Sequence, residues 1–334
     1  MDAIRKRRSG ELIRSASVRL PFSIPPVETA DFDIVGLGQN SVDLLAVVDG
    51  YPASNGKHRL RGFSQLPGGQ IATAVAVCRR LGWRARYIGS FGDDPMGRMS
   101  RESLVGEGVD LGGSRIVEGA TNQFAIIIVD ACSGARTILW NRHPALAMEA
   151  SLVPKAAVTA GRLLLVDGDD TEASAEAVRA ARAAGVPTLV DVERVGPGIH
   201  ELLAAIDAII AAQSFPEELT GCAQPGRALE AMAREFDAPL VCVTLGEGGS
   251  LARCGGRDLF TPAFKVDCVD STGAGDAFHG GFAAGCLRRS GGDLEDVLMY
   301  ASAVAALNCR ALGARASMPT ADEVEQLLRA RGVH

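Results

Sequence analysis

Apolar and polar positions follow a regular rhythm from about residue 160 onward. Short apolar runs, typical of strands, occur in the segments RLLLVDGDD, VPTLVDVE, AIDAIIAA and PLVCVTLG. Between them lie stretches with helical periodicity at 172–184, 198–205, 216–221 and 225–236. Apolar strands that alternate with helices indicate βαβ units and a parallel sheet with helices on both faces. The pattern therefore predicts a doubly wound, mainly parallel α/β fold.

The flanking segments extend this pattern. Before residue 160, the sequence predicts a strand at 31–38, a helix at 69–82, a strand in RARYIGSFG and a helix in DPMGRMSRESLVGEG. After the last central strand, GSLARCGGRDLFTPAF predicts a β-hairpin, and helices follow at 275–289, 293–311 and 320–331. We therefore expect one large domain over residues 31–334.

Two stretches, at about 43–66 and 115–143, differ from the rest. Both are rich in strand-forming residues, are broken by turn residues and lack long helical patterns. The second contains TNQFAIIIVDACSGARTILW, which predicts a hairpin with ACSGA as its turn. We expect these segments to form a small β-sheet lid beside the main body.

Composition and charge narrow the function classes. The net charge is −6, and the sequence contains nothing that indicates a basic groove, which argues against a nucleic-acid partner. No apolar run approaches the ~20 residues that cross a bilayer, so we expect no membrane partner. The eight cysteines form no CxxC pair, and the five histidines form no metal-binding cluster. The simplest interpretation is a reduced, cytoplasmic protein without structural zinc.

Residues 1–30 differ in composition from the remainder. The segment MDAIRKRRSGELIRSASVRL is rich in Arg and lacks the apolar core of a signal peptide. Its Asp2 and Glu11 count against a transit peptide. We predict a poorly ordered N-terminal arm over residues 1–30.

The segment VDSTGAGDAFHGGF, residues 269–282, places chemistry at a helix start. A polar turn leads into Gly273-Ala274-Gly275-Asp276 and then into an apolar helix. The first backbone N–H groups of a helix lack partners and the dipole there is positive, so such a turn can hold a phosphate. Plain helix capping is the alternative, and the segment alone leaves both open. No Walker A loop occurs in the chain.

Three further elements point toward a ligand. VTLGEGGS, residues 243–250, follows a strong strand, at the end where α/β sheets bind ligands. Gly68-Gly69 precedes a helix, and Asn40 and Asp43 follow the first strand, where side-chain oxygens can hold hydroxyl groups. For each element an ordinary turn is the alternative. The segment GLGQNS only partly matches a dinucleotide fingerprint, which makes an NAD dehydrogenase the weakest hypothesis.

These elements, in this order, resemble the ribokinase-like sugar kinases of the phosphofructokinase B type, over roughly residues 32–332. GGQIATAVAVCRRLGWRARYIGSFGDDPMG is similar to the N-terminal signature of that family, and DSTGAGDAFHGGFAAG to its C-terminal signature, D-T-x-G-A-G-D. The resemblance implies a doubly wound α/β domain with a β-sheet lid over the sugar. It also implies ATP-dependent phosphorylation of a sugar or nucleoside hydroxyl.

The resemblance also implies roles for residues of this chain. Asp276 is the implied general base, and the amides of 273–276, including those of Gly273, Ala274 and Gly275, form the implied anion hole. The implied sugar contacts are Asn40, Asp43, Gly68, Gly69, Thr73, Asn141 and Arg142. The implied ATP contacts are Thr244, Gly246, Glu247, Gly248, Gly249 and Ser302. A monovalent cation, K⁺, would lie at Asp270, Thr272, Gly313 and Ser317, and Mg²⁺ would accompany ATP.

The chain departs from the family pattern at two places. Thr73 stands where many relatives have Asn in G-G-x-x-x-N, and AAQSFPEELTG lacks the usual N-x-x-E, for which Glu217 or Glu218 is a candidate substitute. The lid residues Trp140, Asn141 and Arg142, with Lys57 and Arg59, are candidates for contact with the substrate. The cations among them either bind a phosphate or sulfonate on the sugar or are solvated surface charges.

The leading hypothesis is an ATP-dependent kinase for a ketose or related sugar. A nucleoside kinase of the same fold, acting on a substrate such as adenosine, is the first alternative, but aromatic residues make up only 5% of the chain and few fall in the lid. A nucleotide- or sugar-binding protein without catalysis is the second. We further expect the lid to close over the sugar and to form a homodimer through its exposed strand edges.

Overall fold

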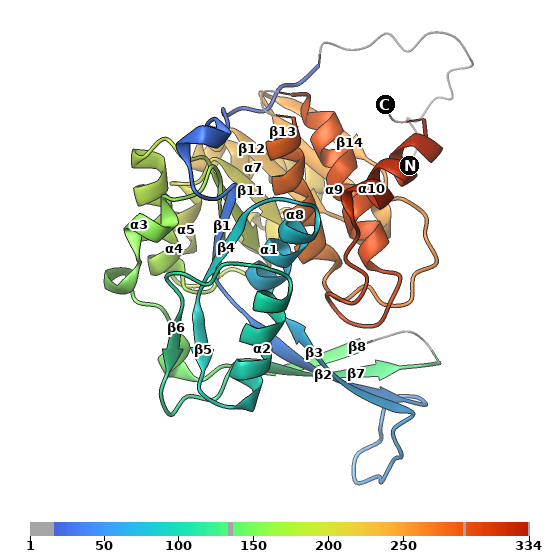
Figure 1. Cartoon of the computed structure of the whole chain (residues 1–334). Helices are drawn as coiled ribbons and strands as arrows, with labels where there is room; N and C mark the ends of the chain where they lie inside the picture. The colour runs from blue at the N-terminus through green and yellow to red at the C-terminus, as the bar shows by residue number, and fades with distance from the viewer. Residues whose placement is uncertain (1–16, 133–135, 290–291, 333–334) are drawn as a thin grey trace, which may run out of the picture.

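A central sheet of eight strands organises the body of the protein in this computed structural model, which describes residues 17–132, 136–289 and 292–332 (Figure 1). In spatial order the strands are β14 (Arg257–Thr261), β13 (Ser250–Cys254), β12 (Leu240–Thr244), β11 (Ala208–Ala211), β10 (Thr188–Val192), β9 (Leu164–Asp167), β1 (Ile34–Leu37) and β4 (Ala85–Ile88). The strands from β12 to β4 pair in parallel, and β13 and β14 add an antiparallel hairpin.

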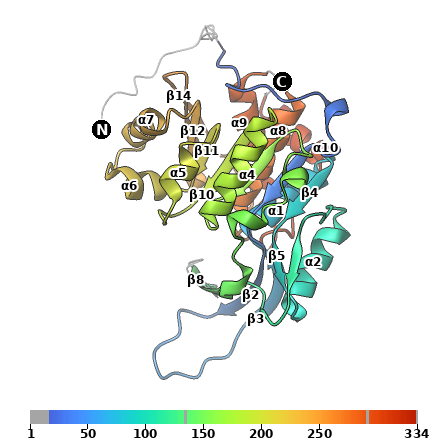
Figure 2. The same ribbon diagram turned by 90° about the vertical axis from the view of Figure 1, so that its left-hand side faces the viewer.

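Helices cover both faces of this sheet, as Figures 1 and 2 show. One face packs against α1 (Gln70–Arg80), α8 (Ala274–Arg288), α9 (Leu294–Asn308) and α10 (Ala321–Ala330). The other packs against α3 (Lys155–Val158), α4 (Thr171–Ala183), α5 (Ile199–Leu203), α6 (Phe215–Thr220) and α7 (Pro225–Phe236). Neighbouring strand residues such as Leu164 and Leu165 point into opposite cores, because side chains alternate along a strand. The predicted doubly wound α/β fold is confirmed.

A second sheet of four strands lies below the body in Figure 1. Its order is β3 (Gly62–Gly68), β2 (Ser41–Val48), β7 (Phe124–Asp130) and β8 (Arg136–Asn141). The β7–β8 hairpin is antiparallel as predicted, and residues 133–135 of its turn lie outside the described residues. We call this sheet the lid sheet.

The predicted second lid segment, 115–143, includes a strand that belongs elsewhere. β6 (Arg115–Val117) pairs with β5 (Ser90–Gly92) in a separate two-stranded sheet beside α2 (Pro95–Gly106). Short 3-10 turns occur at Val27–Thr29, Pro144–Leu146, Ala150–Leu152 and Gly246–Gly248. The lid sheet thus begins at Phe124 in this part of the chain.

The predicted N-terminal arm is only partly described. Residues 1–16 lie outside the described residues. Val18, Leu20 and Ile24 are buried in the core on the α8–α9 side of the sheet. The Leu20 N–H donates to Gly292 O at 3.2 Å, and the Leu294 N–H donates to Val18 O at 2.7 Å. Alternating apolar positions therefore attach residues 18–24 to the body, where the composition had indicated a loose arm.

Among the described residues, no helix is long and apolar enough to cross a membrane. The eight cysteines are all free, and Cys78, Cys242, Cys254, Cys286 and Cys309 are buried. Burial in apolar surroundings fits the expectation that these thiols pack as small hydrophobic groups.

Candidate active site

The chain passes directly from β1 into lid strand β2, and from lid strand β3 into α1. The lid sheet therefore adjoins the carboxyl ends of the parallel strands, where ligands bind in α/β folds. The predicted GAGD turn, at the N-terminus of α8, reaches the same region.

Gly273 and Gly275 flank the start of α8 for different reasons. Gly273 is the N-cap residue and has φ 75°, a left-handed conformation that favours glycine. A Cβ on Gly273 would also lie 2.7 Å from the Cα of Ala314. A Cβ on Gly275, by contrast, would meet no atom of the described residues within 4 Å outside its own helical turn. Gly273 is required by the backbone, whereas Gly275 leaves open space in front of the turn.

The backbone N–H groups of this turn differ in whether they have a hydrogen-bond acceptor. The Ala274 N–H donates to Ser271 O at 3.2 Å, and the Ala277 N–H donates to Gly273 O at 2.8 Å. Within the described residues, the amides of Gly273, Gly275 and Asp276 have no acceptor. Free N–H groups at a helix N-terminus attract anions. Of the four predicted anion-hole amides, those of Gly273, Gly275 and Asp276 are thus free donors, and that of Ala274 is not.

Asp276 is half-buried in the first turn of α8. Burial is the main cause that raises the pKa of its carboxyl well above the ordinary value. The nearby carboxylates of Asp191, Glu193 and Asp43 raise this pKa further, and the Arg315 guanidinium opposes them. A carboxyl with a raised pKa at the end of a sheet is a candidate proton acceptor.

His279 and Asp191 form a buried pair one turn beyond Asp276, and the sequence did not single them out. The Nδ1 atom of His279 lies 3.3 Å from an Asp191 carboxylate oxygen and 2.8 Å from Gly275 O, and Nε2 lies 3.3 Å from Ile210 O. Burial lowers the pKa of His279 and raises that of Asp191. The ring thereby joins the first turn of α8 to β10 and β11. An isolated His in an otherwise apolar helix was the only signal available.

Asp43 and the Gly68-Gly69 turn pack together at the lid boundary. A Cβ on Gly68 would lie 2.3 Å from an Asp43 carboxylate oxygen, and one on Gly69 would lie 2.4 Å from the Cα of Asn40. Gly69 also has φ 90°. The Ser41 hydroxyl donates to Asp43 at 2.9 Å, while burial raises the pKa of the Asp43 carboxyl. The structure therefore brings the predicted residues Asp43, Gly68 and Gly69 into one cluster.

Thr73 is fully buried on α1, and its partner is a residue that the sequence did not indicate. The Arg315 Nε–H donates to the Thr73 hydroxyl at 3.0 Å. Two other N–H groups of Arg315 donate to Gly68 O at 2.5 Å and to the Ser103 hydroxyl at 3.2 Å. Thr73 thus binds an arginine from the far end of the sequence.

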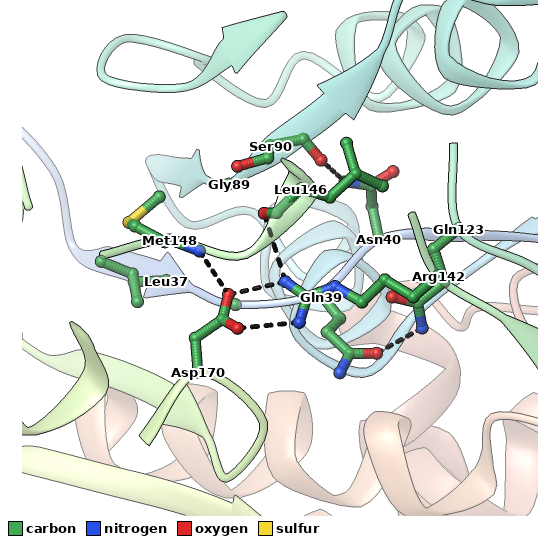
Figure 3. Close-up of a pocket in the computed structure, with 11 residues that line it drawn as sticks. Leu37, Gln39, Asn40, Gly89, Ser90, Gln123, Arg142, Leu146, Met148 and Asp170 are labelled. Atoms are coloured by element: carbon green, nitrogen blue, oxygen red, sulfur yellow. Dashed lines mark hydrogen bonds and ion pairs between the residues drawn. The ribbon is translucent and has the colours of Figure 1, made fainter. Parts of the chain in front are cut away.

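Asn40 and Arg142 line a small cavity between the body and the lid sheet (Figure 3). Arg142 forms a two-pronged ion pair with Asp170, at 2.8 and 2.6 Å. The Asn40 side chain donates to Ser90 O and to the Tyr87 hydroxyl and accepts from the Ser100 hydroxyl. The cavity, of about 10 Å³, has room for about one water molecule. Arg142 therefore ties the end of β8 to the body, and Asn40 ties the β1–β2 connection to β4, β5 and α2. The cavity that both side chains line is itself too small for a sugar.

The remaining predicted lid contacts are exposed. Asn141 is exposed at the end of β8, and Lys57 and Arg59 lie exposed on the connection between β2 and β3. Trp140 shares a face of the lid sheet with Asp43, because the two are in register through Ala125. The Arg194 guanidinium lies 4.8 Å from the centre of its ring. Trp140 thus faces the body.

The predicted ATP loop follows β12. Thr244 ends this strand, and Gly246–Gly248 form a 3-10 turn. Gly249 has φ 93°, and a Cβ there would lie 2.1 Å from Thr261 O. Glu247 is exposed.

Ser302, on α9, lies beside the end of β14, since its hydroxyl donates to Pro262 O at 3.1 Å. Glu217 and Glu218 are exposed on α6, and Glu218 accepts a hydrogen bond from the Val195 N–H.

The predicted cation loops meet through Asp270. Its carboxylate accepts from the N–H and hydroxyl of Thr272, at 2.9 and 2.8 Å, and from the Gly313 N–H at 2.8 Å. The Ser317 hydroxyl donates to Asn308 O at 2.7 Å. Asn308 is fully buried, and its side-chain Oδ1 has no hydrogen-bond donor among the described residues. The described residues as a whole contain no group of three or more His, Cys, Asp or Glu side chains that could hold a metal ion.

A model of the pfkB family carbohydrate kinases matches residues 31–321, which is most of the chain. The chain belongs to the pfkB family of carbohydrate kinases. The resemblance seen in the two signatures is thereby confirmed.

Individual relatives agree with this assignment. The chain is 33% identical over 300 residues to an ATP-dependent ribose-1-phosphate kinase of Halopiger xanaduensis, which covers 89% of this chain and 98% of the relative. It is 30% identical over 308 residues to a fructokinase of Klebsiella pneumoniae, covering 85% and 97% of the two chains. The solved structure of Arabidopsis thaliana ribokinase complexed with ribose and ATP superposes with a TM-score of 0.77 at 25% identity, over 89% and 99% of the two chains. These pfkB-family relatives are named as kinases of sugars.

Proposed function

We propose that this pfkB-family protein transfers the γ-phosphoryl group of ATP to a sugar hydroxyl, with Asp276 as the general base. The observation that carries the proposal is the first turn of α8. It places a carboxyl of raised pKa next to free backbone amides and an open space. A hydroxyl is a weak nucleophile at neutral pH, and a carboxylate within hydrogen-bond reach removes its proton as the bond to phosphorus forms.

The free amides of Gly275 and Asp276 stabilise the charge that develops on the transferred group. Their N–H groups and the positive end of α8 are fixed before the reaction, so no reorganisation is needed. In our proposal ATP extends from this turn toward the loop after β12, where Thr244, Gly246, Glu247, Gly248 and Gly249 bind it, with Ser302 behind them. Mg²⁺ bound with ATP would neutralise phosphate charge, and Glu217 and Glu218 on α6 are the residues that we propose would hold it.

The sugar, in this proposal, binds between the lid sheet and the N-terminus of α1. Asp43 accepts hydrogen bonds from sugar hydroxyls, and Gly68 and Gly69 let the sugar approach the backbone. Thr73, buried on α1, contributes to this site indirectly, through its hydrogen bond with Arg315. Asn141 at the edge of the lid sheet stays a candidate contact, whereas Asn40 and Arg142 have structural partners already. A ketose or related sugar is the substrate class that we favour, in keeping with the fructokinase among the relatives.

A nucleoside acceptor is the second candidate. One observation favours it: Trp140 presents its ring on the inner face of the lid sheet, and half of this side chain remains exposed. Aromatic rings of this kind stack on nucleobases as well as on sugars. Comparison of thermal shifts with fructose, ribose and adenosine separates the two, since only the true acceptor class raises the melting temperature.

We also propose a K⁺ site beside the GAGD turn. The oxygen-rich loops at Asp270, Thr272, Gly313 and Ser317 suit a monovalent cation, which prefers neutral and carboxylate oxygens. The buried Oδ1 of Asn308 lacks a donor, and a cation or water there would satisfy it. Asn308 also contacts Gly273 O and Ala314 O, at 3.5 and 2.8 Å, so the occupied site would steady the GAGD turn.

We further propose a homodimer formed through the lid sheet. On its outer face, Phe63, Ile126 and Leu139 are 61%, 38% and 53% exposed. Ile126 and Leu139 are in register with Leu44 on the same face. An exposed apolar sheet face of this kind favours burial against a second copy. The free cysteines are consistent with our proposal that the dimer resides in the cytoplasm.

A screen for ATP consumption tests the proposed function. The purified protein is incubated with MgATP and a panel of sugars, sugar phosphates and nucleosides, with K⁺ or with a bulky organic cation at equal ionic strength. We expect ADP release with at least one sugar and faster release with K⁺. ADP release with nucleosides only would favour the second candidate. No release with any acceptor, in a protein that binds both ATP and a sugar, would indicate the non-catalytic alternative.

A further inference from the structure

Three consecutive residues after α9 each contact a different part of the proposed site. The Gly313 N–H donates to Asp270 in the cation loop, at 2.8 Å. Ala314 packs against Gly273, so closely that a Cβ on that glycine would lie 2.7 Å from the Ala314 backbone. Arg315 donates to Gly68 O in the sugar turn. The segment 313–315 therefore joins the cation loop, the GAGD turn and the sugar turn.

Arg315 is the unexpected member of this segment. Arg315 is only 9% exposed. Its three hydrogen-bond partners lie on three different elements: Gly68 at the end of β3, Thr73 on α1 and Ser103 on α2. None of the carboxylates in the described residues lies within 4 Å of its guanidinium. Burial of a guanidinium without an ion-pair partner is costly, which favours a role beyond packing.

We propose that Arg315 is a positioning residue for the sugar substrate. It acts through Gly68 and Thr73. By binding Gly68 O, it fixes the turn in which Gly68 lies directly against the Asp43 carboxylate. By binding the Thr73 hydroxyl, it fixes the first turns of α1 against that loop. The inference rests on the proposed function, because it takes the sugar to bind at Asp43 and the Gly68-Gly69 turn.

The charge of Arg315 adds a second effect, on Asp276. The guanidinium lowers the pKa values of Asp276 and Asp43, against the burial that raises both. The other charged groups that act on Asp276 are Asp191 on β10, Glu193 just after it and Asp43 on β2, which all raise its pKa. His279, on the same helix, is paired with Asp191. Removal of Arg315 therefore leaves Asp276 among carboxylates alone, and its pKa rises.

The test compares Arg315→Met and Arg315→Lys with a matched control, Arg310→Met. Arg310 lies on the same loop, but it is exposed and bonds to Leu307 O and Glu323, away from the site.

The measurements are kcat, the KM values for the accepted sugar and for ATP, the pH profile of kcat/KM and the thermal midpoint. For Arg315→Met we expect a rise of at least tenfold in the KM for the sugar, and a change below twofold in the KM for ATP. The acid limb of kcat/KM should move by about one pH unit to higher pH. Arg310→Met should match the wild type, and Arg315→Lys should lie between.

A merely structural role would give a different result. The thermal midpoint and the active fraction would then fall, while the sugar KM and the pH profile of the remaining enzyme stayed at wild-type values; this outcome would overturn the inference. If Arg315→Met does not fold, Arg315→Lys and Thr73→Val decide, because the latter removes only the acceptor of the Arg315 Nε–H. Failure of the proposed function would show separately, as a wild-type protein that phosphorylates no sugar.

Discussion

Gly273 and Gly275 stand two residues apart in the same helical turn, and the structure gives them opposite constraints. Gly273 has a left-handed φ and no room for a side chain, so the fold itself requires a glycine there. Gly275 has ordinary helical geometry and empty space in front of it. A glycine that the backbone does not need is best explained by a ligand that approaches its amide. The sequence showed both glycines but carried no sign of this difference.

Substitution by Ala separates the two constraints. Gly273→Ala should lower the free energy of unfolding by about 2 kcal/mol, because Ala is strained at this φ and collides with Ala314. Gly275→Ala should leave stability unchanged or slightly raised, since Ala favours helices, but should lower kcat at least tenfold by blocking the amide. Urea unfolding and steady-state rates measure the two effects. Equal stability losses in both variants would contradict this assignment.

At the scale of elements, periodicity predicted the strands and helices well because each buries an apolar face of matching period. The side-chain links between elements were not predictable in this way. Arg142 reaches Asp170 on the body, and Arg315 reaches Gly68 across 247 positions of sequence. No spacing rule relates such distant residues. Arg142 was thus taken as a substrate contact, and Arg315 was missed.

The Arg142–Asp170 pair gives a prediction for the attachment of β8 to the N-terminus of α4. The two side chains are 18% and 15% exposed, so Arg142→Met leaves a largely buried carboxylate with only the Met148 N–H and solvent. The free energy of unfolding should fall by about 2 kcal/mol, as measured by urea titration. Arg59→Met, at an exposed arginine of the β2–β3 connection, is the control and should change it by less than ~0.5 kcal/mol. Equal stability of both variants would show that the ion pair does not hold the lid sheet.

At the scale of the whole molecule, the sequence predicted the fold class and the family, and it singled out the GAGD turn and the glycine turns that the structure places in the candidate site. It did so because glycine-rich turns and the GAGD segment are local features, and local features keep their spacing. The buried partners Asp191, His279 and Arg315 come from separate elements and converge only in three dimensions. The same reason explains why residues 18–24 are attached to the body although the composition predicted a loose arm. Val18 and Leu20 form backbone hydrogen bonds with Leu294 and Gly292, which are far away in the sequence.

The outer face of the lid sheet gives a prediction for assembly. Leu139→Lys should convert the proposed dimer to a monomer, because a charge placed at the centre of an apolar interface costs several kcal/mol. Light scattering coupled to gel filtration measures the mass. Val105→Lys, at a residue of α2 that is 59% exposed outside the lid sheet, is the matched control and should leave the mass unchanged. A monomeric wild type would remove the proposed interface, and a dimeric Leu139→Lys variant would place it elsewhere.

Steady-state turnover of Asp276→Asn, with any sugar that the wild type accepts, tests the central claim most directly. Asn keeps the shape of the side chain and the amides of the turn, but it cannot take a proton. We expect kcat to fall at least 10³-fold, while ATP affinity and the thermal midpoint stay close to wild type. Turnover within tenfold of the wild type, in a protein that binds ATP normally, would contradict the assignment of Asp276 as the general base.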